Sequence, residues 1–165
     1  MAALMRFALL SNRARTVTLE QALEVTRHYL DLEVLRFEAR LRYRVTVVPE
    51  ALGHPVPPML VQTLVENAIK HGIAKLPEGG EVRIEARMSS HDLHIRVTNT
   101  GALTGNGASE GIGLANSLER LRLLFGDRAT LAISASGPDE VSCDVVIPGP
   151  MSQPAADRTG SERES

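Results

Sequence analysis

The sequence contains no tryptophan, and aromatic side chains make up only 3% of its 165 residues. A surface that binds single-stranded nucleic acid by stacking bases on aromatic rings therefore has little support. The net charge of -2 at pH 7 also provides no overall basicity to attract a phosphate backbone. The composition predicts that nucleic acid is not a partner.

Cysteine occurs only once, at Cys143, which excludes an intrachain disulfide and a cysteine-rich zinc site. This usage fits a reducing compartment, so we expect a cytoplasmic location. No apolar run approaches the roughly 20 residues that a membrane-spanning helix requires, and no membrane segment is predicted in this chain. If the chain belongs to a membrane protein, the spanning part lies elsewhere.

The hydrophobic content of 43% provides enough apolar side chains for one compact domain. Before this domain, the apolar stretch 2–10 is typical of the end of a helix. After it, the composition from Pro148 onward turns to Pro, Ser, Gly, Glu and Arg, which predicts a disordered tail over 149–165.

The stretch from Pro57 to Gly72 predicts a helix, because the two prolines suit a first turn and glycine readily ends a helix. Asn67 and His71 lie one turn apart, beside Lys70, in a polar sector. That sector either faces a polar ligand or is an ordinary solvated helix face. It borders a predicted core-facing stripe, formed by Leu60, Val61, Leu64, Val65, Ala68 and Ile69.

A second helix is predicted to begin at Thr18, which forms a capping-box pattern with Gln21, and to run toward Phe37. It carries two apolar stripes. The first contains Leu19, Ala22, Leu23, Leu30 and Phe37, and the second contains Val25, Leu32 and Leu35. The second stripe is either buried in the same domain or a docking surface for a partner. His28 lies along it and is more typical of a structural or exposed histidine than of a phosphoacceptor.

Alternation of apolar and polar residues predicts strands at 43–47, 82–88, 93–97, 131–133 and 141–147, with Cys143 facing the core. The inward phase of the third strand continues to Asn99, which predicts a buried amide that needs hydrogen-bond partners. Alternatively, Asn99 starts a turn, because Asn-Thr-Gly is common turn chemistry.

The glycine-rich stretch from Gly101 to Gly113 runs directly into a predicted helix at 114–125, closed by Gly126. Glycines allow backbone N–H groups to approach an anion, and the start of a helix offers unpaired donors, so this arrangement can hold phosphate. The stretch lacks Gly-Lys-Ser/Thr and is not a P-loop. Its Gly-Ile-Gly is also too short for a dinucleotide-binding fingerprint.

Three stretches in this order, 57–72, 97–101 and 111–116, together resemble the ATP-binding domain of the Bergerat or GHKL group, especially that of LytS/YehU-type sensor histidine kinases. Similarity at 17–23, 29–33 and 35–37 also carries the resemblance, which covers roughly Arg6 to Pro148. The resemblance implies an α+β fold, a two-layer sandwich whose mixed, mostly antiparallel sheet is covered by three helices. It also implies ATP and Mg²⁺ as cofactors.

The resemblance assigns roles to residues of the predicted central helix. Asn67 matches the asparagine that ligates Mg²⁺ on the triphosphate, and Lys70 and His71 match residues near the phosphates. Glu66 stands where the family has an acidic residue implicated in catalysis, although it could also be an exposed glutamate that pairs with Lys70. Thr63 occupies the position where gyrase, Hsp90 and MutL have a water-activating glutamate, so hydrolysis without an acceptor is disfavoured.

The remaining nucleotide-binding positions lie around the glycine-rich stretch, which matches the ATP lid. Asn99 matches a residue, usually Asp, that accepts a hydrogen bond from the adenine amino group, and an amide oxygen can also accept. Ala115 departs from the family, which has a basic residue there. The other matching positions are Gly101, Gly111, Gly113, Leu114 and Asn116.

The resemblance implies that the protein transfers the γ-phosphate of ATP to a histidine on another domain or chain. The phosphoryl group then passes to a response regulator. By the same resemblance, residues 1–16 end a truncated phosphoacceptor and dimerisation helix region, and 17–148 form the ATP-binding domain of a membrane-anchored kinase. The family's acceptor segment, Pro-His-Phe-Leu-Phe-Asn, does not occur in this sequence. The alternative is therefore a non-catalytic ATP-binding module that pairs with a kinase. A dimer is compatible with either interpretation.

Overall fold

The computed structural model describes residues 16–103 and 112–149. The predicted helix end before Thr16 lies outside this range, as do the tail after Gly149 and the greater part of the predicted lid, which includes Gly111. The predicted domain boundaries therefore stay predictions.

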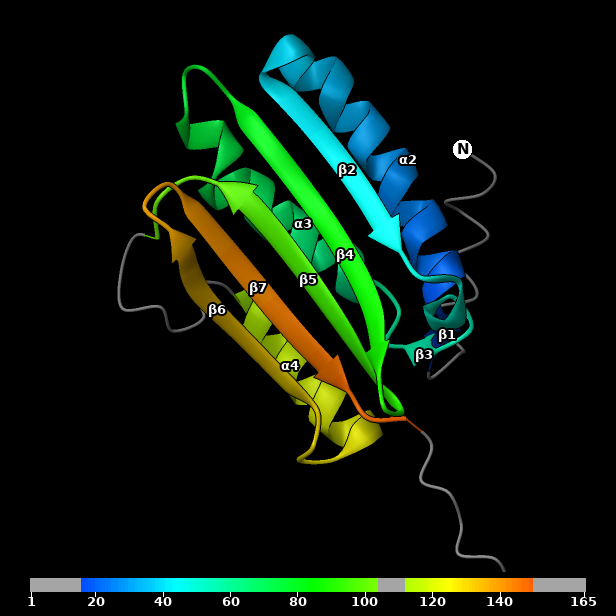
Figure 1. The fold of residues 1–165 in the computed structure, drawn as a ribbon. Helices are drawn as coiled ribbons and strands as arrows, with labels where there is room; N and C mark the ends of the chain where they lie inside the picture. Colours follow the sequence, from blue (N-terminus) through cyan, green and yellow to red (C-terminus); the bar gives the residue numbers. More distant parts are fainter. Residues whose placement is uncertain (1–15, 104–111, 150–165) are drawn as a thin grey trace, which may run out of the picture.

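Five strands form one sheet in the order β2-β4-β5-β7-β6 (Figure 1). Their bounds are Leu41–Val47 for β2, Gly80–Ser89 for β4, Asp92–Thr100 for β5, Thr130–Gly137 for β6 and Glu140–Ile147 for β7. Strand β2 pairs parallel with β4, and the other neighbours pair antiparallel. The prediction of a mixed, mostly antiparallel sheet is confirmed.

Within the described residues, three helices lie on one side of this sheet, behind it in the view of Figure 1: α2 (Leu19–Phe37), α3 (Leu60–His71) and α4 (Ile112–Phe125). Short 3-10 turns occur at η1 (Glu38–Arg40), η2 (Pro49–Ala51) and η3 (Ile73–Lys75). The arrangement is the predicted two-layer α+β sandwich. No helix in the described ranges combines the length and apolar character needed to cross a membrane.

Local sequence signals account for the ends of α2 and α3. At the start of α2, Thr18 Oγ1 accepts from Gln21 N over 3.2 Å, and Gln21 Oε1 accepts from Thr18 N over 3.1 Å. This pair of bonds confirms the capping box. Helix α3 begins after two buried prolines and ends where Gly72 N donates to the Ala68 carbonyl over 3.0 Å.

A small additional sheet joins the beginning of the domain to the chain just before α3. Strand β1 (Val17–Thr18) pairs antiparallel with β3 (Pro55–Val56), and we call this pairing the β1–β3 clasp. Beside it, Leu19 N donates to the His54 carbonyl over 2.9 Å. The segment 51–58 is therefore more than an irregular connection, because it contains Ala51 at the end of η2 and the whole of β3.

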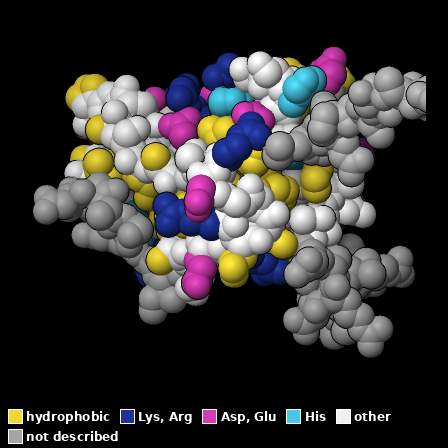
Figure 2. All heavy atoms as spheres, turned by 90° about the horizontal axis from the view of Figure 1, so that it is seen from below, with side chains coloured by type: hydrophobic (Ala, Val, Ile, Leu, Met, Phe, Trp, Pro, Cys, Tyr) yellow, Lys and Arg dark blue, Asp and Glu magenta, His cyan; other side chains and the backbone are white. Residues whose placement is uncertain are grey.

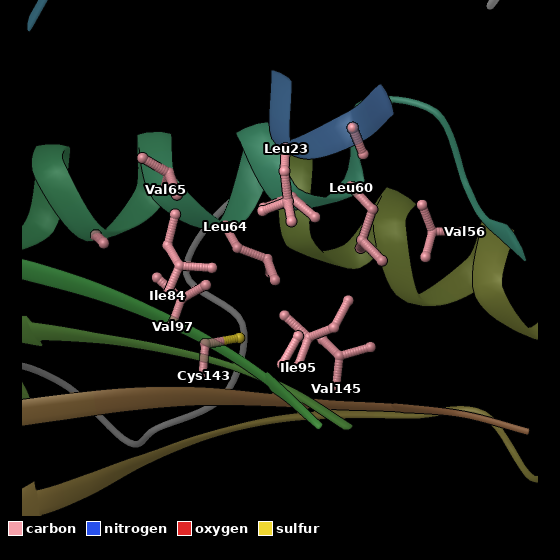
Figure 3. Packing of buried hydrophobic residues seen from close by; sticks show 14 of the residues in the cluster. Leu23, Val56, Leu60, Leu64, Val65, Ile84, Ile95, Val97, Cys143 and Val145 are labelled. Atoms are coloured by element: carbon pink, nitrogen blue, oxygen red, sulfur yellow. The ribbon is translucent and has the colours of Figure 1, made fainter. Parts of the chain in front are cut away.

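The core lies between the sheet and the helices (Figure 3). Leu60, Leu64 and Val65 of α3 point toward side chains of three strands, among them Ile84, Ile95, Val97, Cys143 and Val145. Cys143 is buried, as predicted, and burial together with the nearby Asp144 carboxylate raises the pKa of its thiol to about 12. Its position favours a packing role.

The second apolar stripe of α2 is divided between the core and the surface. Val25 is buried, whereas Leu32 is 58% exposed and Leu35 is 76% exposed. The interpretation that the whole stripe is buried in one domain is therefore wrong, and the stripe is not one continuous surface either. His28 is exposed.

The side of the sheet away from the helices is held together by charged pairs. Arg96 Nε donates to Asp144 Oδ1 over 2.6 Å, and Arg83 pairs with Glu140. A hollow of about 320 Å³ lies there, lined by residues such as Glu85, Arg87 and His94. Seen from below, the molecule carries charges of both signs interspersed with apolar side chains (Figure 2).

Candidate functional site

Helix α3 presents the predicted polar sector beside the core. All six residues of its predicted apolar stripe are buried, which fixes the rotation of the helix about its axis. Asn67 and His71 are half-buried at the border of the stripe, and Glu66 and Lys70 are exposed. A half-buried amide such as that of Asn67 can face a ligand from this border without being fully solvated.

The end of α3 lies directly against the end of β5. Asn99 is 8% exposed and belongs to the strand, so the alternative that it starts a turn is wrong. Its Nδ2 donates to the Thr100 carbonyl over 3.0 Å. A Cβ at Gly72 would lie only 2.2 Å from that Nδ2, and a Cβ at Gly101 would lie 3.1 Å from Gly72 Cα. Two glycines without side chains therefore permit this close approach.

The other contact of α3 is with the start of α4. A Cβ at Gly113 would lie 3.3 Å from Thr63 Cγ2, so the backbone at the start of α4 passes beside α3 one turn before Asn67. The first turn of a helix carries N–H groups without intrahelical partners, which suit an anion. Of the neighbouring predicted residues, Leu114 is buried and Asn116 is exposed.

Asn67 thus lies between two junctions on the same helix. Thr63 meets Gly113 at one end, and Gly72 meets Asn99 and Gly101 at the other. The structure therefore brings together, along α3, positions that the sequence places in three separate stretches.

Glu66 lies on a different side of α3 from Asn67, because adjacent helical residues point in different directions. Its Oε1 accepts from Gln62 Nε2 over 2.8 Å, so its partner comes from the turn before it instead of from Lys70. On α2, the pKa of Tyr29 is raised to about 12 by burial and then by the carboxylates of Glu33 and Glu66. Glu66 therefore contributes to the electrostatic environment of Tyr29.

The described residues contain no group of three or more His, Cys, Asp and Glu side chains that could hold a metal ion. The amide of Asn67 does not provide a complete metal site by itself. Mg²⁺, however, is commonly held by one or two protein oxygens while phosphate oxygens and waters complete its shell. The donor set therefore fits a magnesium ion that arrives with a polyphosphate.

Two residues were not recognised as part of the site from the sequence. Gly72 was interpreted only as the end of a helix, and its contact with Asn99 depends on a packing that no local pattern encodes. Gln62 was not singled out, although its spacing of one turn from Glu66 was a usable signal.

No protein-family model matches the chain. It is 33% identical to the sensor histidine kinase BtsS of Escherichia coli strain K12 over 124 residues, which cover 74% of this chain and 22% of BtsS. It is 36% identical to the sensor protein LytS of Enterococcus faecalis over 86 residues, which cover 52% of this chain and 15% of LytS. The chain therefore spans less than a quarter of the length of these relatives.

Solved structures share the fold. The catalytic domain of histidine kinase ThkA superposes with a TM-score of 0.64 at 15% identity, covering 81% of this chain and 93% of that domain. A structure of ThkA in complex with the response regulator protein TrrA superposes with a TM-score of 0.58 at 11% identity, covering 82% of this chain and 41% of the matched chain.

Proposed function

The chain is a homologue of sensor histidine kinases over the part that it matches, and we propose that it is the ATP-binding catalytic domain of such a kinase. It transfers the γ-phosphate of ATP to a histidine on another domain or chain. The observation that supports this proposal is the placement of Asn67 between the Thr63–Gly113 and Gly72–Asn99 junctions of α3.

Adenine is assigned to the junction at Asn99. Because Asn99 Nδ2 is already bonded to the Thr100 carbonyl, Oδ1 is the amide atom left to accept from the adenine amino group. Gly72 and Gly101 keep the surrounding backbone free of side chains, which allows a flat base to approach closely. This assignment makes Asn99 equivalent in role to the aspartate that is usual in the family.

The phosphates are assigned to the other junction. Asn67 supplies an amide oxygen for Mg²⁺, which neutralises phosphate charge when it is bound. We assign the backbone N–H groups after Gly113 and the side chain of Asn116 as donors to the phosphate oxygens, and we assign Gly111 to the same lid. Lys70 and His71 add donors on the adjacent turn of α3. Positioning and charge neutralisation of this kind carry most of the catalysis in phosphoryl transfer.

Glu66 is assigned to the acceptor. A histidine attacks phosphorus through one ring nitrogen, and a carboxylate that accepts the N–H of the other nitrogen orients the ring and stabilises its developing charge. Thr63 offers no carboxylate at the position where the wider group activates water. The geometry therefore favours transfer to an acceptor over release of phosphate to water.

The partners follow from this chemistry. We assign two partners to this protein. The first is a domain or another chain that carries the phosphoacceptor histidine, and the second is a response regulator, in keeping with the ThkA–TrrA complex. Dimerisation through the acceptor region and a cytoplasmic site of action, below a membrane-anchored sensor, belong to the same proposal.

Calorimetric titration with ATP tests the nucleotide site. The chain is expected to bind ATP more tightly with Mg²⁺ than without it, and Asn67→Ala is expected to lose that difference while retaining its fold. Labelling of a separately supplied LytS-type acceptor domain by γ-labelled ATP then tests transfer. Magnesium-dependent binding without any labelling would instead support a non-catalytic module that pairs with a kinase.

A further inference from the structure

Gln62 and Glu66 face each other one turn apart on α3. Gln62 Nε2 donates to Glu66 Oε1 over 2.8 Å, and Gln62 is half-buried whereas Glu66 is exposed. An exposed glutamate on a helix has several staggered rotamers available. The charge-assisted bond from Gln62 selects one of them.

The orientation of the Gln62 amide follows from its surroundings. Its Oε1 is buried and has no hydrogen-bond partner within the described part of the chain. Reversing the amide would place that oxygen against the Glu66 carboxylate and would bury the N–H donors without an acceptor. The amide therefore keeps its donor side toward Glu66.

The carboxylate of Glu66 also acts on α2. Tyr29 is half-buried on α2, and burial together with the carboxylates of Glu33 and Glu66 raises its pKa to about 12. Glu33 is itself paired with Arg36 over 3.5 Å. The orientation of the Glu66 carboxylate therefore rests on its hydrogen bond from Gln62.

We propose that Gln62 is a positioning residue that holds the Glu66 carboxylate in the orientation used for phosphoryl transfer. The inference rests on the proposed function, in which Glu66 orients the acceptor histidine. Gln62 acts through Glu66 and does not bind the nucleotide. Its loss therefore slows transfer and leaves ATP affinity unchanged.

The test uses the full chain, γ-labelled ATP with Mg²⁺, and a separate LytS-type acceptor domain that carries the Pro-His-Phe-Leu-Phe-Asn segment. Gln62→Met retains the length of the side chain but removes the amide. We expect the maximal labelling rate to fall about 10-fold, which is less than the roughly 100-fold or more that an acid–base group itself typically contributes. We also expect the dissociation constant of Mg-ATP to stay the same. Stability is expected to be unchanged or higher, because the buried unpartnered oxygen is removed.

The matched control is the same substitution in a Glu66→Gln background. If Gln62 acts through Glu66, Gln62→Met causes no further loss there, since two residues that act as a unit are not additive. Independent, additive losses would overturn the inference. So would an unchanged rate in Gln62→Met, or a loss of ATP binding in that variant.

Gln62→Glu allows a second test, the pH dependence of the labelling rate, which a purely structural role of Gln62 would not change. At neutral pH the new carboxylate repels Glu66, and at lower pH a shared proton restores a hydrogen bond between them. The labelling rate of this variant, relative to the native chain, is therefore expected to recover as the pH falls. A constant ratio across pH contradicts the inference. Failure of the native chain to label the acceptor at all would overturn the proposed transfer, and this inference with it.

Discussion

The side-chain amide of Asn99 lies so close to Gly72 that a Cβ at position 72 would be 2.2 Å from Asn99 Nδ2. The same Cβ would be 2.7 Å from the carbonyl oxygens of Ala68 and Thr100. Two of these three atoms belong to the backbone, so the contact cannot be relieved by a flexible side chain. This junction joins the last turn of α3 to the end of β5.

Gly72→Ala is expected to displace Asn99 and separate these elements. Overpacking of this kind costs about 1–3 kcal/mol of unfolding free energy. Because Asn99 is the proposed adenine contact, ATP affinity is expected to fall roughly 10-fold or more, the equivalent of about 1.4 kcal/mol. Urea unfolding and calorimetry measure the two effects. Gly53→Ala is the control, since a Cβ there meets nothing within 4 Å, and equal effects in both variants would contradict the prediction.

Leu32→Glu and Leu35→Glu test the exposed part of the second α2 stripe. Both side chains are more than half exposed, so stability is expected to change by less than about 0.5 kcal/mol. If this surface docks the helical acceptor domain, the rate of histidine labelling is expected to drop about 10-fold at limiting acceptor concentration. Leu123→Glu on α4 provides the control, because Leu123 is 80% exposed on a different helix. An unchanged labelling rate in both α2 variants would show that this surface does not dock the acceptor domain.

Tyr29 predicts a decline of stability at alkaline pH. The ordinary pKa of tyrosine is 10.0, and in the folded chain that of Tyr29 is about 12, so the folded state retains a proton that the unfolded state releases. Its contribution is fully present below about pH 10 and is lost as the pH rises toward 12. Urea unfolding across this range is expected to show a shallower decline for Tyr29→Phe. An identical pH dependence in both proteins would contradict the raised pKa of Tyr29. Some decline of stability with pH remains in Tyr29→Phe, because the thiol pKa of Cys143 is also raised.

Thr63→Glu tests whether the lack of a carboxylate at position 63 is the reason that phosphoryl transfer to an acceptor is favoured over hydrolysis. Thr63 lies one turn before Asn67 and beside Gly113, where the proposal places the phosphates. A carboxylate there can act as a general base toward water, an effect typically worth about 100-fold or more. Steady phosphate release from Mg-ATP is expected to rise in this variant in the absence of any acceptor. Thr46→Glu, on the uncovered face of the sheet, serves as the control, and no difference between the two would argue against the placement of the phosphates.

Features with strong local signals were predictable from the sequence. Two prolines and Gly72 bracket α3, Thr18 and Gln21 form the capping box, and the alternation of β5 carries Asn99 into a buried position. Each of these depends on residues only a few positions apart, so no knowledge of distant contacts was needed.

Features that depend on distant contacts were not predictable in the same way. Pairing of Val17 with Val56 and the parallel pairing of β2 with β4 involve residues far apart in the chain, and two-residue strands leave no periodicity to detect. Helical spacing placed Leu32 and Val25 on the same apolar stripe, but it could not show that Leu32 is exposed while Val25 is buried. Likewise, Glu66 has possible partners one turn before and one turn after it, and only the structure shows that Gln62 is the partner.

The β1–β3 clasp links the beginning of the domain to the segment just before α3. Val17 pairs with Val56, and the two buried prolines and Met59, with φ of +67°, lead from there to Leu60. Prolines restrict the backbone, so this short connection is stiff. A displacement of β1 is therefore expected to shift the first turn of α3, and with it the surroundings of Asn67, without any contact at Asn67 itself.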